Sequence, residues 1–490
     1  MKIISNSLEK QTKNSEIYNV GIVGGGISGV VTALSLDKEG IDSVLFEKKT
    51  SVVNGPPFCH LHAGGNLYPD ISDEQCRKLM RQSIEMARLF PLSIDKRPTF
   101  ISIPKSEKYD VNTIERRLKM LVVFYKKLIN EDPGNEILGA PDAYYKKYNK
   151  EDLLALVERP TVKYPKSADE WMTNTIKLID YKYLKTPVFI VQEYGWNLFR
   201  VGAQAKLALD KSEKCSLRTN TEITHIEDVR DQNLDYNWKI ITNDTEYKVK
   251  YLVNSCGFKT GKLDHSLNFN VKGLIEFKAA YISKWKTIPG LIPELIFHGE
   301  RATSHGMAQL TPYNGDFYQI HGMTKDITLF EKGLIESTGY DRPHEFDAAI
   351  KRKLNSHWEE DEINSRTENA IKFISHFVHS FQSATVGGIP LYGAQQIPGE
   401  DPNLRVGEAS FPSPFYARSQ IVKASSALTV ANQIINKIKE EEELTSKANI
   451  AAGNTLLDSI SKQDIDKMAS KLAVERGYPE AMSHLLIDRD

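Results

Sequence analysis

Cysteine is scarce in this sequence, and long apolar runs are missing from it. Four cysteines, Cys59, Cys76, Cys215 and Cys256, lie far apart with neither a CxxC pair nor the spacing of a metal site. This pattern argues against a disulfide scaffold and predicts reduced thiols in a cytoplasmic protein. No apolar run approaches the ~18 residues that cross a bilayer, and the polar N-terminus lacks the apolar core of a secretory signal. We therefore expect no membrane span, while peripheral contact with a membrane stays open.

An excess of either charge is also lacking. Lysine and arginine number 63 against 64 aspartates and glutamates, which gives a formal net charge of -1. Such a balance creates no overall field for nucleic acid or anionic lipid, so we expect a small-molecule partner and no nucleic acid. The 490 residues are more than one hydrophobic core usually supports, which predicts two packed domains or one large two-part fold.

Glycine is concentrated near the N-terminus, in a unit that runs from Tyr18 to Glu47. YNVGIV has the composition of a buried parallel strand, GVVTALSLDKEG has helical spacing, and DSVLFE has the character of a second buried strand. Gly24, Gly26 and Gly29 stand between the first strand and the helix in GxGxxG spacing. Such glycines make a tight turn, let the backbone approach a pyrophosphate and let helix and strand pack closely. The order of these elements predicts dinucleotide binding.

The two ends of this unit predict contacts with different parts of the nucleotide. The helix begins near Ile27 and Ser28, where unpaired N–H groups and the helix dipole favour the pyrophosphate anion. Glu47 lies near the offset of ~20 residues at which an acidic side chain binds an adenosine ribose hydroxyl. An acid there disfavours a 2'-phosphate, so we expect FAD or NAD rather than NADP.

The stretch FCHLHAGGNLYPD follows and contains His62, Ala63 and Gly64. Together with the glycine unit, it resembles FAD-dependent oxidoreductases of the D-amino-acid-oxidase-like superfamily, which includes amine oxidases, dimethylglycine dehydrogenase and L-2-hydroxyglutarate oxidase. The resemblance covers residues 18–437 and implies FAD as the cofactor, with the His-Ala-Gly stretch beside the flavin ring. Some relatives bond the matching histidine covalently to the flavin and others do not, so covalency at His62 stays open.

The resemblance also implies an α/β fold of two intertwined domains. A Rossmann-type FAD-binding domain, discontinuous in sequence, would pack against an antiparallel-sheet substrate domain, followed by a helical C-terminal extension. The predicted boundaries are a polar tail at 1–16, the FAD-binding domain at 17–95, 186–272 and 380–440, the substrate domain at 96–185 and 273–379, and the extension at 441–490.

Two later segments would complete the FAD-binding domain. Gly257, after VNSC, resembles the small residue at the end of the family's last buried strand, where the cofactor approaches. LRVGEASFPSPFYARSQ predicts a strand at Leu404–Val406, then Gly407 and Glu408, a loop, and a helix from about Ser419. The family points this helix at the flavin pyrimidine carbonyl, which implies cofactor contacts at Gly407 and Glu408. The loop lacks the family's usual glycines.

Asn314-Gly315, within GMAQLTPYNGDFYQIHGMT, is a hairpin signal between two alternating runs. Phe317, Gln319 and His321 should therefore share one face of a strand. The resemblance implies that this sheet roofs the flavin and carries substrate-binding side chains.

Substrates in this superfamily are usually small amines or hydroxy acids with a carboxylate. A buried carboxylate is bound well by an arginine fork. Arg418, beside the predicted ring-facing helix, is the leading candidate for this fork, and Arg301 is the second. An ordinary surface or capping arginine is the alternative for both, and the better interpretation of Arg301.

Oxidation of a hydroxy acid also needs a base for the hydroxyl proton, which histidine supplies near neutral pH. His321 and His305 lie in the segment expected over the flavin ring, although a structural histidine is the alternative for each. We therefore predict an FAD-dependent oxidoreductase, an oxidase or dehydrogenase, that transfers a hydride from a small carboxylate-bearing substrate to flavin N5. A 2-hydroxy acid is marginally preferred. An amine or amino-acid oxidase or dehydrogenase and a non-catalytic FAD-binding protein are the alternatives, and the electron acceptor is open.

Residues 448–490 extend beyond the family core. Ser461 predicts a helix cap, and Ile465, Met468 and Leu472 form an apolar stripe. Because the polar face of this helix is mixed rather than basic, we expect it to pack on the body of the protein and not on a membrane.

Overall fold

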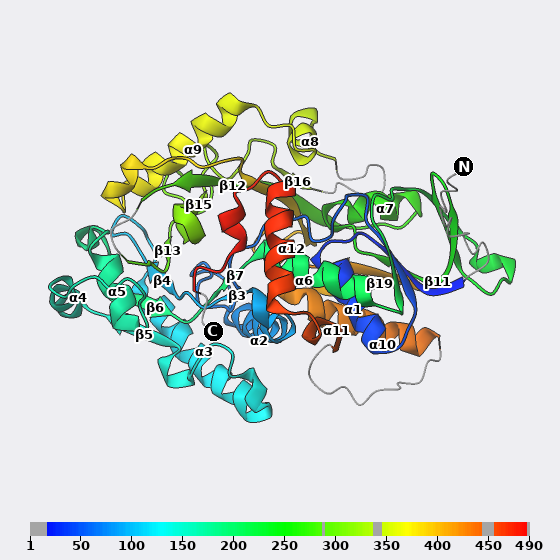
Figure 1. Cartoon of the computed structure of the whole chain (residues 1–490), viewed down its shortest axis with the longest axis horizontal. Coiled ribbons are helices and arrows are strands. Elements are labelled where there is room, and N and C mark those ends of the chain that lie inside the picture. Colours follow the sequence, from blue (N-terminus) through cyan, green and yellow to red (C-terminus); the bar gives the residue numbers. More distant parts are fainter. Residues whose placement is uncertain (1–16, 287–289, 337–344, 443–454, 488–490) are drawn as a thin grey trace, which may run out of the picture.

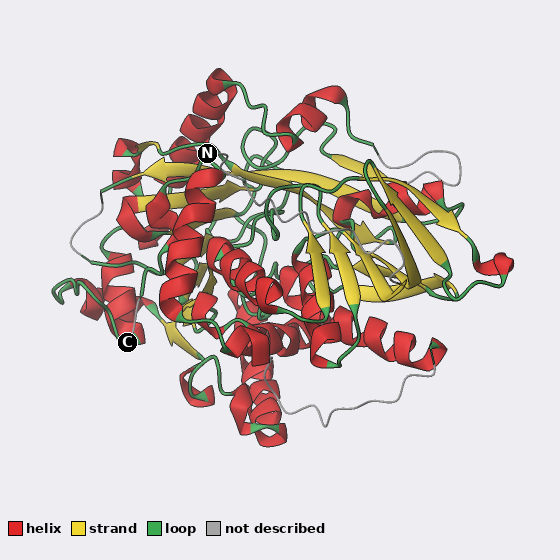
Figure 2. Ribbon diagram, turned by 45° about the vertical axis from the view of Figure 1, so that its right-hand side comes forward, coloured by secondary structure: helices red, strands yellow, loops and turns green. Residues whose placement is uncertain are grey.

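Two large β-sheets with helices packed around them make up most of the structure, a computed structural model that describes residues 17–286, 290–336, 345–442 and 455–487 (Figures 1 and 2). The predicted tail at 1–16 and most of the stretch between 441 and 455 lie outside the described residues. One sheet has eight strands and the other has ten. The predicted α/β architecture with a helical C-terminal region is confirmed. Within the described ranges, no helix combines the length and apolarity that crossing a membrane requires.

The nucleotide domain begins with the strand–helix–strand unit that the glycine pattern predicts. β1 (Ile17–Val23) lies between two parallel neighbours, β2 (Ser43–Phe46) and β11 (Glu246–Asn254), and α1 (Ile27–Lys38) joins β1 to β2. Parallel strands are covered on both faces, which explains their nearly continuous apolar sequence. The domain also contains β8 (Cys215–Arg218), β9 (Ile223–Asp228), β10 (Trp238–Thr242), β19 (Glu408–Ser413), β20 (Tyr416–Gln420), α6 (Leu198–Lys211), α7 (Thr260–Ser266) and α10 (Ala427–Glu441).

Two glycines allow α1 to start directly after β1. Gly24 has a φ of +106°, a conformation that side chains with a Cβ rarely adopt. At Gly29, an added Cβ would lie 1.9 Å from the carbonyl oxygen of Gly24, so the helix crosses the turn at backbone contact. The geometry at both positions agrees with the turn and packing roles that the spacing predicts.

The second domain, predicted to bind the substrate, is built on the ten-stranded sheet, in the order β16-β12-β15-β14-β13-β4-β6-β5, with β17 and β18 paired to β12. Its strands are β4 (Thr99–Ser102), β5 (Tyr145–Tyr148), β6 (Val188–Val191), β12 (Gly273–Lys284), β13 (Glu294–Phe297), β14 (Ala308–Pro312), β15 (Phe317–Gly322), β16 (Leu334–Glu336), β17 (Thr385–Val386) and β18 (Leu391–Pro398). Its helices are α3 (Val111–Glu131), α4 (Lys150–Val157), α5 (Ala168–Ile176), α8 (Ala348–Leu354) and α9 (Glu360–Ser375). Between the domains lie α2 (Asp73–Leu89) and a two-stranded sheet of β3 (Ile94–Asp95) and β7 (Gly195–Trp196).

Antiparallel strands β14 and β15 form the hairpin that Asn314-Gly315 predicts. Gly315 has a φ of +73° in the connecting turn. Along β15 the side chains alternate between the two faces of the sheet, which places Phe317, Gln319 and His321 on the same face.

The observed sheets differ from the predicted boundaries at three strands. β6 pairs with β4 and β5, while β17 and β18 pair with β12, so all three strands belong to the ten-stranded sheet. The predicted boundaries had assigned them to the FAD-binding domain. Their apolar sequences fit either sheet, and only the partner strand decides between the two.

The predicted order of elements near residue 404 is wrong. Strand β20 contains Ser419, where a helix was expected to begin, and α10 starts only at Ala427. Leu404–Val406 is not a strand, and the strand before β20 starts at Glu408. Parallel pairing of β20 with β11 buries its residues, and this tertiary contact decides the local structure.

The C-terminal region forms α11 (Thr455–Asp458) and α12 (Lys462–Glu475), and α12 packs against α6 (Figure 1). Ser461 caps α12 by accepting the backbone N–H of Asp464 at 3.1 Å. Ile465 and Leu472 are buried in the same core as α6. The predicted cap and the predicted packing against the body of the protein are confirmed.

The close approach at Gly29 leads to a prediction about stability. Gly29→Ala should lower the free energy of unfolding by roughly 1–3 kcal/mol or more, because its Cβ would meet a backbone oxygen that cannot move away. Gly202→Ala is the matched control, since its Cβ, within α6, would meet its nearest atoms at 3.5 Å. Alanine is also favoured over glycine inside a helix, so the control should be neutral or stabilising. Chemical denaturation of both variants measures the difference, and equal stabilities would contradict the prediction.

Candidate active site

A cavity of about 230 Å³ lies between the glycine turn and the substrate sheet. Its wall includes the first residues of α1, the loop between β2 and α2, the residues after β20, and parts of β12, β14, β15 and β18. Gly26, predicted beside the pyrophosphate, and His321, predicted over the flavin ring, therefore line one space.

The end of the cavity at the glycine turn has room for a phosphate against the backbone. Apart from the glycine itself and its chain neighbours, no atom of the described residues lies within 4 Å of the position that a Cβ would take at Gly26 or at Gly257. Ile27 and Ser28 line the same wall, and no described side chain caps the start of α1. Helix N–H groups beside an open space form an anion site. These residues fit the pyrophosphate of a dinucleotide such as FAD.

Glu47, predicted to bind the ribose, also closes the glycine turn. One carboxylate oxygen accepts the backbone N–H of Gly25 at 3.0 Å, and the other accepts that of Lys49 at 2.8 Å. A carboxylate has further lone pairs beyond these two bonds, so the contact with a ribose hydroxyl stays a prediction.

Only one residue of the predicted ring-side stretch lines the cavity, and this is His62. Ala63 is fully buried in the core. A Cβ at Gly64 would lie 2.5 Å from the carbonyl oxygen of Cys76, so Gly64 lets this stretch pack on α2. Cofactor contacts of Ala63 and Gly64 stay predictions.

Gly407 and Glu408 lie at the start of β19, next to the cavity wall and not in it. The N–H of Gly407 donates to the hydroxyl of Ser426 at 3.2 Å, and a Cβ at Gly407 would lie 2.7 Å from the Cα of Ile421. Glu408 is exposed. Gly407 therefore packs against the segment after β20, which forms part of the cavity wall. Direct contact of Gly407 or Glu408 with the cofactor stays a prediction.

Arg418, the leading candidate for the carboxylate fork, is turned away from the cavity. Its Nε lies 2.9 Å from a carboxylate oxygen of Asp264, and its Nη2 donates to the carbonyl of Asn270 at 2.6 Å. Ser419, the next residue along β20, lines the cavity and shares a hydrogen bond with Ser28. Because alternate residues of a strand point to opposite faces, the strand that replaces the expected helix directs Arg418 to the other side.

Arg301, the second candidate for the carboxylate fork, is already paired with a carboxylate, and His305, the second candidate for the base, lies outside the cavity wall. Arg301 forms an ion pair with Glu276, whose carboxylate lies in the cavity wall. His305 is exposed in the loop that follows, with its backbone N–H bonded to the hydroxyl of Thr303 at 3.2 Å. The roof therefore does not contain His305, because the chain leaves the sheet between β13 and β14.

His321 lies where the sequence predicts it, on the cavity wall from β15. Burial, together with the positive charges of His60 and Lys278, lowers the pKa of His321 to about 3. The ring is therefore neutral near neutral pH and keeps a lone pair that can accept a proton.

Three basic side chains that no sequence motif indicates also line the cavity: Lys278 from β12, whose pKa burial lowers to about 7, Arg405, and Lys423 just after β20. Lys278 lies 2.6 Å from Glu276, which also pairs with Arg301. Burial lowers the pKa of Lys423, so a nearby anion would favour its charged form. A signal for Lys278 existed in the sequence, since it interrupts the apolar strand GLIEFKAAYISK.

Three neutral residues in the wall have side-chain polar atoms with no hydrogen-bond partner among the described residues. These atoms are both amide atoms of Asn66, which is 5% exposed, and the hydroxyls of Tyr68 and Ser255. Buried polar atoms are almost always hydrogen-bonded in folded proteins. Such atoms on a cavity wall therefore mark contacts for a bound molecule.

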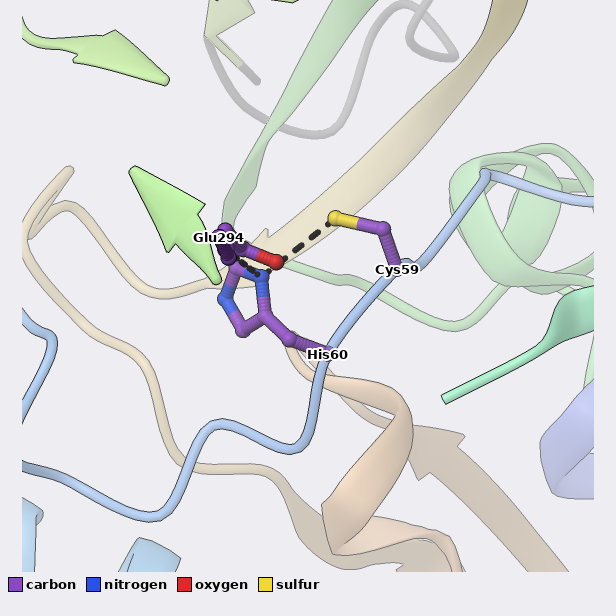
Figure 3. Close-up of side chains that lie close together, drawn as sticks. All are labelled: Cys59, His60 and Glu294. Carbon is purple, nitrogen blue, oxygen red and sulfur yellow. Dashed lines mark hydrogen bonds and ion pairs between the residues drawn. The ribbon is translucent and has the colours of Figure 1, made fainter. Parts of the chain in front are cut away.

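A network of buried charges lies beside the cavity, around Glu294 (Figure 3). Arg97 Nη1 contacts one carboxylate oxygen at 2.6 Å, and His60 Nδ1 contacts the other at 2.8 Å. Gln309 also donates to the second oxygen at 2.8 Å. Burial opposes ionisation of both partners, but their mutual attraction outweighs it. The pKa of Glu294 falls to about 2 and that of His60 rises to about 10.

The same cluster contains ligand types that bind metals. Potential ligand atoms of Cys59, His60 and Glu294 lie within 4.8 Å of one another. A metal there would compete with Arg97 and with a protonated His60, because both already occupy the carboxylate. The observed contacts are those of an ion-pair network, and we assign no metal to it.

His60 connects this network to His62. The Nε2 atoms of the two rings lie 3.2 Å apart, and the rings are tilted against each other with centroids 4.1 Å apart. Burial and nearby positive charges lower the pKa of His62, so His62 is neutral and accepts the hydrogen bond from the protonated His60. The lone pair on Nε2 of His62 is therefore engaged, which disfavours a covalent bond through that atom.

Comparisons with known proteins agree with this fold. A family model described as an NAD(P)-binding Rossmann-like domain matches residues 22–55, which contain the glycine turn. No curated protein matches the sequence.

Solved structures resemble the chain over most of its length. Glycine oxidase from Geobacillus kaustophilus is 12% identical, with a TM-score of 0.54 over 89% of this chain and 100% of its own. L-alpha-glycerophosphate oxidase from Mycoplasma pneumoniae, solved with FAD bound, is 14% identical, with a TM-score of 0.55 over 87% and 95%. L-proline dehydrogenase from P. horikoshii is 12% identical, with a TM-score of 0.56 over 89% and 96%. The chain therefore shares its fold with these solved oxidases and with the dehydrogenase.

Proposed function

We propose that this protein is an FAD-dependent oxidoreductase that oxidises a small anionic substrate. The observation that carries the proposal is a single cavity with two chemically different ends. Gly26, Ser28 and Gly257 leave open backbone at one end, and Lys278 and His321 lie on the substrate sheet at the other. A cofactor that binds through phosphates and reacts with an anion would use both ends.

FAD is favoured over a nicotinamide dinucleotide by the shape of the fold. The glycine turn alone suits either cofactor. The substrate sheet encloses the cavity on the side opposite the turn, and similar structures with this two-domain arrangement include an oxidase solved with FAD bound. We propose non-covalent binding, because His60 engages the Nε2 lone pair of His62.

An anionic substrate is favoured by the cations on the wall. Lys278, Arg405 and Lys423 take the place that Arg418 was predicted to fill. A carboxylate between such cations would form charge-assisted hydrogen bonds and would be stabilised by the low dielectric of the buried site. Asn66 and Tyr68 supply unpaired polar atoms for an uncharged group of the substrate or of the cofactor.

A 2-hydroxy acid remains the preferred substrate. When bound, FAD would accept the hydride from the carbon that bears the hydroxyl group. Neutral His321, which lines the cavity, would take the hydroxyl proton, so that the alcohol becomes a carbonyl group. Its low pKa in the free protein makes it a weak base there, and a bound carboxylate would raise this pKa through its negative charge.

An amino acid or amine is the second candidate substrate. Similar structures include glycine oxidase and L-proline dehydrogenase, and the same cations would bind an amino-acid carboxylate. Release of ammonia, or formation of an imine product, during turnover would distinguish this reaction. A bound flavin that no small hydroxy acid or amine reduces would instead favour a non-catalytic FAD-binding protein.

The cofactor assignment predicts that the purified protein is yellow and releases FAD into the supernatant on acid precipitation. Gly26→Val should abolish FAD binding, because the branched side chain would fill the space next to the helix N-terminus. Gly26 has a φ of -67° and a ψ of 177°, which valine also adopts, so the apoprotein should remain folded. Absorbance spectra and circular dichroism measure the two effects. Wild-type protein that cannot be reconstituted with FAD would contradict the proposed function.

The substrate assignment predicts that Lys278→Met raises the KM for a carboxylate substrate by about 10-fold or more, with a smaller change in kcat. Glu276 would keep its partner Arg301, so this variant leaves no carboxylate unpaired. Lys284→Met, at the exposed end of the same strand, is the matched control and should behave like wild type. Steady-state kinetics on a panel of 2-hydroxy acids tests this. Equal KM values for both variants would remove Lys278 from the binding site.

The proposed base predicts that His321→Gln lowers kcat on a 2-hydroxy acid by ~10²- to 10⁴-fold while FAD stays bound. Because the pKa of His321 is about 3, free wild-type enzyme should show no His321 ionisation in kcat/KM between pH 5 and pH 9. His305→Gln, on the exposed loop, should keep wild-type turnover. Rapid flavin reduction kinetics gives the rates. Wild-type turnover in His321→Gln would show that another group takes the proton or that the substrate is an amine.

A further inference from the structure

The C-terminal extension has no part in the proposed chemistry, yet it is anchored at several places. Arg200 of α6 forms an ion pair with Asp466 of α12. Beyond α12, the carboxylate of Asp95 accepts the backbone N–H groups of Leu486 at 2.9 Å and of Ile487 at 3.1 Å. α12 crosses the molecule in front of α6 (Figure 1). These contacts fix the extension on α6 and on the two-stranded sheet between the domains.

Arg476, the residue that follows α12, reaches the loop after β2. Its Nη2 donates to the carbonyl of Val52 at 2.8 Å and to the hydroxyl of Ser51 at 3.1 Å. Its Nη1 donates to the carbonyl of Val53 at 3.0 Å. One guanidinium therefore satisfies three acceptors of a single loop, which its planar set of donors allows.

This loop belongs to the dinucleotide site. The N–H of Val53 donates to the carbonyl of Gly25 at 2.8 Å, and Val53 lines the cavity together with Gly26. Val53 has a φ of +55°, a left-handed conformation that a β-branched side chain strongly disfavours. Such a conformation persists only where the surrounding structure holds it. The carbonyl groups of Val52 and Val53 are held from outside by Arg476.

We propose that Arg476 is a positioning residue for the dinucleotide: it holds the Ser51–Val53 loop against the glycine turn, so that the C-terminal extension is needed for tight FAD binding. This inference rests on the proposed FAD site. Arg476 acts through the loop, since its donors contact loop atoms that in turn contact Gly25. Without the guanidinium, the carbonyls would lose their partners and the loop would have to be ordered by the ligand, which weakens binding.

The alternative is that Arg476 only attaches the extension to the body of the protein. In that case, its loss would lower overall stability and leave the FAD affinity of the folded protein unchanged. The two roles are separated by measuring affinity and stability on the same apoprotein.

The experiment titrates full-length apoprotein with FAD and follows quenching of flavin fluorescence. Arg476→Met should raise the Kd for FAD by about 10-fold or more, because the loop is no longer ordered before binding. Arg476→Lys should give a smaller rise of about 3-fold, since an ammonium cannot reach all three acceptors. Lys471→Met, an exposed residue of the same helix paired only with Glu475 among the described contacts, is the control for charge and should change Kd by less than about 2-fold.

Each outcome supports or overturns a defined statement. A wild-type protein without affinity for FAD would overturn the proposed function and, with it, this inference. FAD affinity equal in wild type and folded Arg476→Met would overturn the inference alone. If Arg476→Met does not fold, Arg476→Lys decides, because it keeps the positive charge and most of the packing. Thermal unfolding of each apoprotein by circular dichroism shows which variants are folded.

Discussion

Glu294 has no exposed surface, and a buried carboxylate has to be neutralised within the fold. Arg97 and His60 neutralise it from segments on either side of α2, while Glu294 itself lies on the substrate sheet. These ion pairs thus hold the loop that carries His60 against the sheet that carries Glu294. Stability from Glu294 is lost as pH falls from 4.5 through about 2, and stability from His60 is lost as pH rises from 6.5 through about 10. Between these limits the network is fully charged.

The nucleotide end of the site was predictable from the sequence because its requirements are local. Gly24 and Gly29 are needed for a turn and a helix contact within one short segment, and the spacing of the glycines records both. His321 was also predictable, since Asn314-Gly315 marks a hairpin and side chains alternate along its strands. The C-terminal helix carries its own cap and apolar stripe.

The substrate end was predictable only in part because its residues depend on pairing between distant strands. Arg418 was assigned to a helix start, but β20 pairs with β11 and turns this side chain toward Asp264. Lys278 and Lys423 reach the cavity from elements far apart in sequence, and neither carries a motif. His60 lies within FCHLHAGGNLYPD, two residues before His62, yet its charge depends on Glu294, which no spacing in the sequence connects with it.

The position of β1 has a consequence for how the chain folds during synthesis. β1 pairs on one side with β2, a near neighbour, and on the other with β11, so that Val20 meets Ser43 and Tyr251. β11 in turn pairs with β20, which is synthesised late because it lies near the C-terminal end of the sequence. Until then, strands with open edges are exposed to other chains, which is a route to aggregation. Neither domain can be completed until most of the protein has left the ribosome. A fragment that ends between two sequence segments of one domain would have an open sheet edge and would not form an independent domain.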